Sequence, residues 1–372
     1  MALNQPRQRL DSLTSLRFFA AALVFFNHFA RDALAQVHAP QPIQQLFQHG
    51  REAVIFFFLL SGFVLSYSYS DGVRPNGMRV SAWEFWWARF TRIYPSYLLA
   101  LALPLPRKLA GAVMGTVPVS QLYDLPWVIL LLQAWIPSKA DAWNPPAWSL
   151  SVEAVFYAFF PIGAMMLLRL QTRFLYLTTL IVLAATAFLQ QSIAPYSPNM
   201  AAFFPLIHLP VFCLGMVFGR EFLCGHLRLR KSLFFFWFAS FCVVAELMFS
   251  SNLPDVLYNP FILALLYGLL ILAAAQLSGV FNNILSSKLL VLLGEASYVL
   301  YILHMPFTVA MQRLVFAFIG DPPLVKSLTF IIFLFAINVM VSVIVHLRFE
   351  MPVRKWLYSH IRSTGRPVVK AG

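Results

Sequence analysis

The stretch Ser15–Asp32, SLRFFAAALVFFNHFARD, is an apolar run that carries an ionisable histidine near its end. A helix that crosses a bilayer needs roughly 20 mostly apolar residues, and this run with its flanks is long enough for one. An imidazole at membrane depth costs free energy, so the presence of His28 requires a structural or functional reason.

The composition extends this membrane character to the whole chain. Of its 372 residues, 60% are hydrophobic and only 11% are charged, whereas about a quarter of the residues in a soluble protein are charged. In lipid a helix satisfies its own backbone hydrogen bonds and an open sheet edge does not. The sequence therefore predicts an all-α polytopic membrane protein.

Ten apolar windows predict about ten spanning helices in one membrane domain. The domain is expected to occupy residues 1–372, with a core at about 10–350 and no additional soluble domain. The basic residues at the start and the small residues at 33–35 resemble a cleavable signal peptide. Asn27 and His28 interrupt its apolar region, so we expect that the first helix is not cleaved off. The windows are 16–36, 53–70, 92–112, 147–168, 174–192, 203–219, 233–250, 258–277, 289–312 and 326–347.

Basic residues are distributed unequally between alternate loops. If the N-terminus is cytoplasmic, most Lys and Arg fall in the inside segments, which is the positive-inside pattern and places both termini in the cytoplasm. We expect a multi-pass protein of the bacterial inner (plasma) membrane. Of the 27 basic residues, the outer segments keep only Arg31, Arg51, Arg107, Lys108, Lys139, Arg313 and Lys326.

One apolar segment, Leu125–Ser138, is short and bounded by prolines. As a full span it would invert every later loop and place the clusters at 169–173 and 220–231 outside. We therefore expect one short interfacial or re-entrant piece within a long outer segment, 113–146, with an eleven-span arrangement as the alternative.

Several partners and cofactors are excluded or left open by composition. The net charge of +13 is spread over short loops, with no basic tail or RNA-binding motif, so the lipid bilayer and not nucleic acid is the expected partner. Cys213, Cys224 and Cys242 have no metal-like spacing, and neither a disulfide framework nor a metal site is predicted. The oligomeric state is not determined by the sequence.

Arg17 and His28 lie eleven residues apart, close to three helical turns, and so share one helix face about 16 Å apart along the axis. A cation at the cytoplasmic mouth and a base at depth suit a long anionic ligand that enters from the cytoplasm. A snorkelling arginine with a structurally buried histidine is the alternative.

Arg89 and Arg92, in WWARFTRIYPSY, stand at i and i+3 where a span begins. Two guanidinium groups on one side of a helix can together bind phosphate oxygens. Arginines at a cytoplasmic helix mouth also serve as topology anchors, and the spacing alone does not separate these roles.

Two polar stripes stand in later spans. Ser149, Glu153 and Tyr157 follow Trp148 at i, i+4 and i+8, and a carboxylate in a span is costly unless it is paired or functional. Ser297, Tyr301 and His304 form the other stripe in SYVLYILHMP, and it is expected to face the bundle interior, as a pocket lining or as packing.

Ser61–Gly62, in the second window, permits either close helix approach or a local break. Small residues let helix backbones approach one another in membranes, and close packing is favoured.

The chain resembles the membrane acyltransferase 3 family, integral proteins that acylate bacterial surface glycans among other acceptors. Five segments of the sequence carry the resemblance, and they follow the order typical of the family. Together they cover residues 10–306. The pieces are LDSLTSLRFFAAALVFFNH, EAVIFFFLLSGFVLSYSY, ARFTRIYPSY, WSLSVEAVFYAFFP and SYVLYILHMP.

The resemblance implies a ten-helix domain that uses acyl-CoA, often acetyl-CoA, from the cytoplasmic side as co-substrate, with no tightly bound cofactor. It maps the essential first-helix histidine of the family onto His28, the first-helix arginine onto Arg17, and the R-x-x-R pair onto Arg89 and Arg92. The Trp-Ser-Leu-Ser-Val-Glu element maps onto 148–153.

These observations predict O-acyl transfer to a hydroxyl of a glycan or glycolipid. His28 is the expected general base, or in a variant route the nucleophile of an acyl-histidine relay, and Glu153 or Ser149 would orient it or the acceptor. Arg17, Arg89 and Arg92 are expected to bind the CoA phosphates, and Trp148, Tyr301 and His304 the substrate. A transporter or flippase of a lipid-linked or charged solute is the alternative, because intramembrane His and Arg also mark transport pathways.

Overall fold

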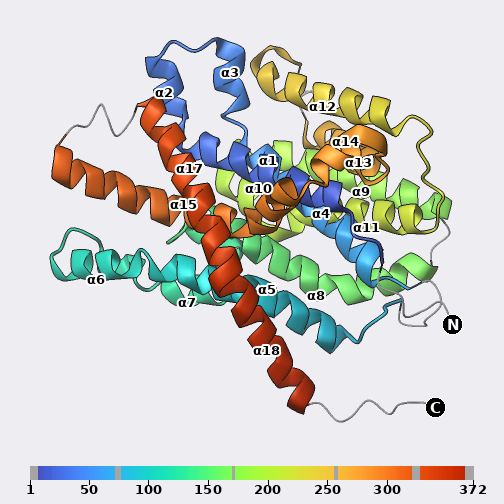
Figure 1. Cartoon of the computed structure of the whole chain (residues 1–372), viewed down its shortest axis with the longest axis horizontal. Helices are drawn as coiled ribbons and strands as arrows, with labels where there is room; N and C mark the ends of the chain where they lie inside the picture. Colours follow the sequence, from blue (N-terminus) through green and yellow to red (C-terminus); the bar gives the residue numbers. More distant parts are fainter. Residues whose placement is uncertain (1–6, 72–76, 170–171, 255–258, 321–326, 365–372) are drawn as a thin grey trace.

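The structure is a computed structural model that describes residues 7–71, 77–169, 172–254, 259–320 and 327–364. In these ranges the chain is helical, and the β pairing is limited to one isolated bridge between Ser70 and Met78. The α-helices (Figure 1) are α1 Asp11–Phe29, α2 Arg31–Gln36, α3 Gln41–Leu46, α4 Gly50–Tyr69, α5 Ala82–Ala102, α6 Leu105–Val113, α7 Leu125–Ile129, α8 Trp148–Arg169, α9 Thr172–Ile193, α10 Pro198–Phe203, α11 Pro205–Leu223, α12 Ser232–Met248, α13 Pro260–Ala275, α14 Gly279–Leu285, α15 Lys288–Ile319, α17 Leu328–Val345 and α18 Met351–Thr364.

Shorter turns connect some of these helices. A π-helical turn, η6 (His346–Glu350), joins α17 to α18 without a break in the helical path. The 3-10 turns are η1 Val119–Gln121, η2 Gln133–Trp135, η3 Pro137–Lys139, η4 Pro145–Ala147 and η5 Ser250–Asn252.

Six helical stretches in the described chain are long and apolar enough to cross a membrane, or seven if the bent pair α13–α14 forms one span. The pair bends by 103° at its break. The multi-pass membrane character predicted from the sequence is therefore confirmed. The six stretches are Gly50–Tyr69, Pro145–Leu167, Arg173–Ile193, Pro198–Leu223, Lys288–Ile319 and Leu328–Ser359.

Three of the ten expected windows contain helices that do not meet this length and hydropathy test. The window 16–36 is divided, because α1 ends at Phe29 and α2 begins at Arg31. The window 92–112 is also divided, because α5 ends at Ala102 and α6 begins at Leu105. The window 233–250 holds α12, which has 17 residues.

The proline-bounded segment 125–138 does not form one long helix. It contains the five-residue helix α7, the 3-10 turn η2 and the start of η3, so the described chain offers no single helix there to serve as an eleventh span. Two expected windows begin outside the described residues, at 258 and 326. The same is true of the basic residues Arg74 and Lys326.

The centre of the bundle is the pair α4 and α11, which pack so closely that glycines separate them. The Cβ that Gly62 lacks would stand 2.9 Å from the backbone nitrogen of Met216, and Gly215 and Gly219 similarly face the backbone of α4. The predicted packing role of Gly62 is confirmed, and α4 runs through it unbroken. Gly215 and Gly219 form a G-x-x-x-G pair, the spacing typical of close membrane helices.

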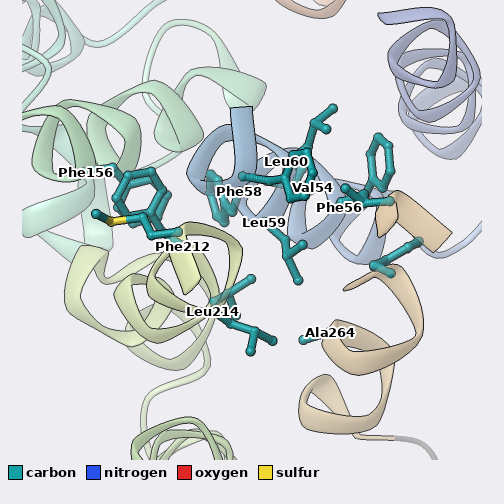
Figure 2. Packing of buried hydrophobic residues seen from close by; sticks show 14 of the residues in the cluster. Val54, Phe56, Phe58, Leu59, Leu60, Phe156, Phe212, Leu214 and Ala264 are labelled. Atoms are coloured by element: carbon teal, nitrogen blue, oxygen red, sulfur yellow. The ribbon is translucent and has the colours of Figure 1, made fainter. Parts of the chain in front are cut away.

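Aromatic rings fill the space beside this glycine contact. Phe58 of α4 meets Phe156 of α8 edge-on at 5.0 Å, and Phe156 stacks on Phe212 of α11 at 4.5 Å. Figure 2 shows these rings together, with Leu59 and Leu214 between α4 and α11. Such ring pairs add roughly 0.5–1.5 kcal/mol each beyond the area that they bury.

Helices α1 and α15 run side by side in the same direction. Gly294 lies against the backbone of Thr14 near the start of both helices, and the rings of His28 and His304 are 5.2 Å apart further along. The two predicted histidines therefore approach each other because α1 and α15 are parallel neighbours.

Candidate functional site

Two adjoining cavities lie where α1, α4, α5, α8 and α15 meet, and together we call them the arginine cavity. Their volumes are about 40 Å³ and 60 Å³. Arg17, Arg92, Glu153 and Tyr157 line both parts. The first part also contains Ser149, Ser297, Tyr298 and Tyr301, and the second contains Arg89 and Ser61.

The helix stripes that the sequence predicts are confirmed here. Ser149, Glu153 and Tyr157 all reach the same cavity from α8. Arg89 and Arg92 of α5 both reach its second part. Helical periodicity brings residues at i, i+3 and i+4 to one face, which accounts for both results.

The arginines are only partly satisfied by their neighbours. Nη2 of Arg89 donates to the hydroxyl of Tyr69 at 2.8 Å, and its guanidinium lies over the Tyr69 ring at 5.2 Å. The Nε atoms of Arg17 and Arg89 are buried without a hydrogen-bond partner. These two guanidinium nitrogens are therefore free for a ligand.

The charge balance of the cavity is positive. Glu153 is the acid among its lining residues, and it accepts a hydrogen bond from Tyr157 at 3.0 Å. Glu350, which also attracts Arg17, accepts a hydrogen bond from His346 at 2.8 Å. In the described part of the chain, the ion pairs include none of Arg17, Arg89 and Arg92.

A hydroxyl pair forms part of the lining of the arginine cavity. The Ser149 and Tyr301 hydroxyls are 2.8 Å apart, and either can donate to the other. The hydroxyl that does not donate within the pair donates to the carbonyl oxygen of Pro146, which lies 3.0 Å from both. Tyr301 lies one helical turn before His304, so this pair stands between the arginines and the two histidines.

The geometry around His304 determines which of its nitrogens carries the proton. Nδ1 lies 2.7 Å from the carbonyl oxygen of Tyr301. A carbonyl only accepts, so Nδ1 is the donor and Nε2 has a free lone pair. Nε2 is buried without a hydrogen-bond partner, and the imidazole of His28 lies beside the ring.

His28 itself is exposed in the protein and does not line the arginine cavity. In the described chain neither Glu153 nor Ser149 has a hydrogen bond to it, since Glu153 bonds to Tyr157 and Ser149 to Tyr301. The side chain next to His28 is His304, whereas the sequence suggested that Glu153 or Ser149 orients His28 or the acceptor.

Trp148 belongs to a different cavity from its neighbour Ser149. Its indole packs against Phe58 and His208 and lines a space of about 590 Å³, which we call the outer cavity. Successive residues of a helix point about 100° apart, so sequence adjacency did not bring Trp148 and Ser149 together.

Sequence reasoning missed three residues at the arginine cavity. Tyr298 lines it and donates to the carbonyl of Ile93 at 2.7 Å. Tyr69 holds Arg89, and Arg354 of α18 is close enough to Arg89 and Arg92 for electrostatic repulsion. Tyr298 stands next to the predicted Ser297, but no pattern in the sequence links α18 to α5.

Comparisons with known proteins agree with this arrangement of motifs. Residues 10–347 match the acyltransferase 3 family, which is described as an acyltransferase domain. The protein named Acyltransferase MdmB from Streptomyces mycarofaciens is 31% identical over 336 residues, which is 80% of this chain and 78% of that protein.

A second relative matches over a shorter region. Protein 2 in picA locus from Rhizobium radiobacter is 31% identical over 127 residues, which is 33% of this chain and 58% of that protein. No solved structure matches the chain. The family match over nearly the whole length shows that this chain belongs to the acyltransferase 3 family and is a membrane acyltransferase.

Proposed function

We propose that this protein transfers an acyl group, with acetyl as the first candidate, from cytoplasmic acyl-CoA to a hydroxyl of a glycan or glycolipid, and that His28 is the general base. The proposal includes ten passes through a bacterial inner membrane with both termini in the cytoplasm. The observation that carries it is the convergence of Arg17, Arg89 and Arg92 on one cavity, with the histidine pair further along the same two helices, α1 and α15.

The arginine cavity suits the phosphate end of acyl-CoA. Arg17, Arg89 and Arg92 line it with a single acid, Glu153, and Arg354 adds a further positive charge beside it. Guanidinium forks match phosphate oxygens, and Arg is enriched where phosphate is recognised. A transported cation would meet a repulsive cavity, which favours an anionic ligand.

The thioester arm would extend from the arginines towards His28. Arg17 and His28 are about 16 Å apart along α1. Cavities of about 40 Å³ and 60 Å³ hold only a few water molecules. Entry of the arm therefore requires lining side chains such as Arg92 and Phe57 to move.

In the proposed reaction, His28 accepts the proton of the acceptor hydroxyl while the hydroxyl oxygen bonds to the thioester carbonyl carbon. The carbon–sulfur bond then breaks, and the CoA thiolate takes the proton that His28 carries. The Nε2 of His304 has no hydrogen-bond partner among the described residues, and its ring lies 5.2 Å from that of His28, so His304 would hold His28 in the productive orientation. Ser149 and Tyr301 would position the acceptor.

Membrane vesicles with accessible cytoplasmic faces and acetyl-CoA labelled in the acetyl group test this proposal. Label should appear in a glycan or glycolipid fraction only when the protein is present. Label that stays on CoA, or that is released only as free acetate, would contradict transfer to a hydroxyl acceptor. Transport of a solute without transfer of label would favour the transporter alternative.

A further inference from the structure

We propose that the outer cavity is a binding site for an uncharged, polyhydroxylated group, a sugar residue of the acceptor. The cavity of about 590 Å³ lies within the size range of small-molecule sites. Its assignment to the acceptor rests on the proposed function, whereas its ligand chemistry is argued from its own residues.

The position of the cavity is opposite to the arginine cavity along α4. Arg51, Glu52, Ile55 and Phe58 line the outer cavity, whereas the α4 residues of the arginine cavity run from Val54 in its first part to Leu65 in its second. From Arg51 to Leu65 the helix axis rises about 21 Å. Phe58 also lines the first part of the arginine cavity, so one aromatic layer separates the two spaces.

Glu246 gives the strongest indication that the cavity takes a ligand. This glutamate of α12 is only 5% exposed, and it lines the cavity. The backbone of Asn259 is nearby, but neither carboxylate oxygen has hydrogen-bond geometry to a described residue. A buried carboxyl group without partners costs free energy that a hydrogen-bonding ligand recovers.

Three other polar side chains of the lining each make one hydrogen bond within the protein and keep a further donor or acceptor. The Nε2–H of His208 donates to the carbonyl of Ala202 at 3.0 Å, which leaves Nδ1 as an acceptor. Gln190 donates to the carbonyl of Ala201 at 2.9 Å and keeps its side-chain oxygen. Asn259 accepts from the N–H of Phe261 at 2.9 Å and keeps its amide donors.

This mixture of donors and acceptors fits hydroxyl groups, which both donate and accept. Trp148 and Phe58 supply aromatic surface at the same wall, against which the apolar face of a sugar ring packs. Arg51 stands with two acids of the lining, Glu52 and Glu246, so there is no excess of cations comparable with the arginine cavity. An anionic ligand is therefore disfavoured.

The first turn of α4 connects the outer cavity to the end of α1 that carries His28. Asn27 packs against Gly50 at the first turn of α4, directly before Arg51 and Glu52. An extended glycan could hold one sugar in the outer cavity and present the hydroxyl of the next residue at His28. The cavity would thus select the acceptor while the arginines select the donor.

The test compares Glu246→Ala and Glu246→Gln with the wild type in two assays. Transfer of labelled acetyl to envelope glycan should fall by roughly 10-fold or more in Glu246→Ala, because hydrogen bonds to the acceptor are lost. Binding of acetyl-CoA to the purified protein should change by less than about two-fold, and Glu246→Gln, which keeps hydrogen-bonding groups, should recover most of the transfer. Asp141→Ala, which removes an exposed carboxylate, is the matched control.

A competition experiment tests the class of ligand. Methyl glucoside should inhibit transfer by the wild type, and glucuronate at the same concentration should inhibit it less. Equal inhibition by both, wild-type transfer in Glu246→Ala, or a joint loss of transfer and acetyl-CoA binding in that variant would overturn the proposal. Failure of the wild type to transfer label to any glycan would instead overturn the proposed function.

Discussion

The imidazole rings of His28 and His304 lie 5.2 Å apart, one on α1 and one on α15. They meet because the two helices are parallel neighbours whose close contact begins at Thr14 and Gly294. His304 presents an unprotonated Nε2 because its Nδ1–H is held by the carbonyl of Tyr301 at 2.7 Å. The pair therefore places a fixed acceptor nitrogen in the ring next to an exposed imidazole.

His304→Phe should impair turnover without weakening the binding of acyl-CoA. The variant keeps an aromatic ring against Phe25 and Phe29 but removes both nitrogens. We expect kcat to fall on the order of 10-fold to 100-fold, which is less than loss of a general base costs. Steady-state kinetics with acetyl-CoA as the varied substrate measure this, and the pH profile of kcat should shift. An increase in KM for acetyl-CoA with unchanged kcat would contradict a positioning role.

Arg92→Ala should weaken the binding of acyl-CoA by roughly 10-fold, the effect of losing a charge-assisted hydrogen bond to phosphate. Arg92→Lys should restore only part of the affinity, because an ammonium group lacks the planar fork of arginine. Calorimetry or filter binding with the purified protein measures both.

Arg228→Ala is the control for this experiment, since Arg228 is exposed and does not line the arginine cavity. It should bind acetyl-CoA as the wild type does. Wild-type affinity in Arg92→Ala would return this arginine to the role of a topology anchor.

The sequence predicted the local stripes of the site but not their assembly. Helical periodicity correctly grouped Ser149 with Glu153 and Tyr157, and Arg89 with Arg92, because residues on one helix face share their neighbours. It did not reveal that Trp148 points to another cavity, since this depends on how α8 is rotated against α4 and α11.

The acids and bases of the outer cavity were also missed for a physical reason. Glu246 and His208 are isolated polar residues in apolar helices, and a single polar residue has no spacing that indicates a partner. The helix limits near Ala30 and Pro104 differ from the expected windows because hydropathy averages over short breaks. The packing of helices that are distant in sequence determines both the partners of Glu246 and His208 and the limits of these helices.

Gly62→Val should destabilise the protein through the contact between α4 and α11. The added side chain would displace the backbone around Met216, because even a Cβ at position 62 would stand only 2.9 Å from the Met216 nitrogen. Overpacking of this kind typically costs about 1–3 kcal/mol. The apparent melting temperature in detergent should fall by several degrees, whereas Ala158→Val at an exposed position of α8 should leave it unchanged. An unchanged melting temperature in Gly62→Val would contradict the observed close approach.

A trapping experiment separates general-base catalysis from the acyl-histidine relay. If His28 is a base, protein incubated with labelled acetyl-CoA without acceptor and then denatured should carry no label. Label on the denatured wild-type protein that is absent from His28→Ala would favour the relay.

The most direct test of the central claim is the rate of acyl transfer by His28→Ala. The variant should insert into the membrane, bind acetyl-CoA through Arg17, Arg89 and Arg92, and transfer label to the glycan fraction roughly 10²–10⁴-fold more slowly than the wild type. Transfer at the wild-type rate by correctly inserted His28→Ala protein would contradict the assignment of His28 as the catalytic base.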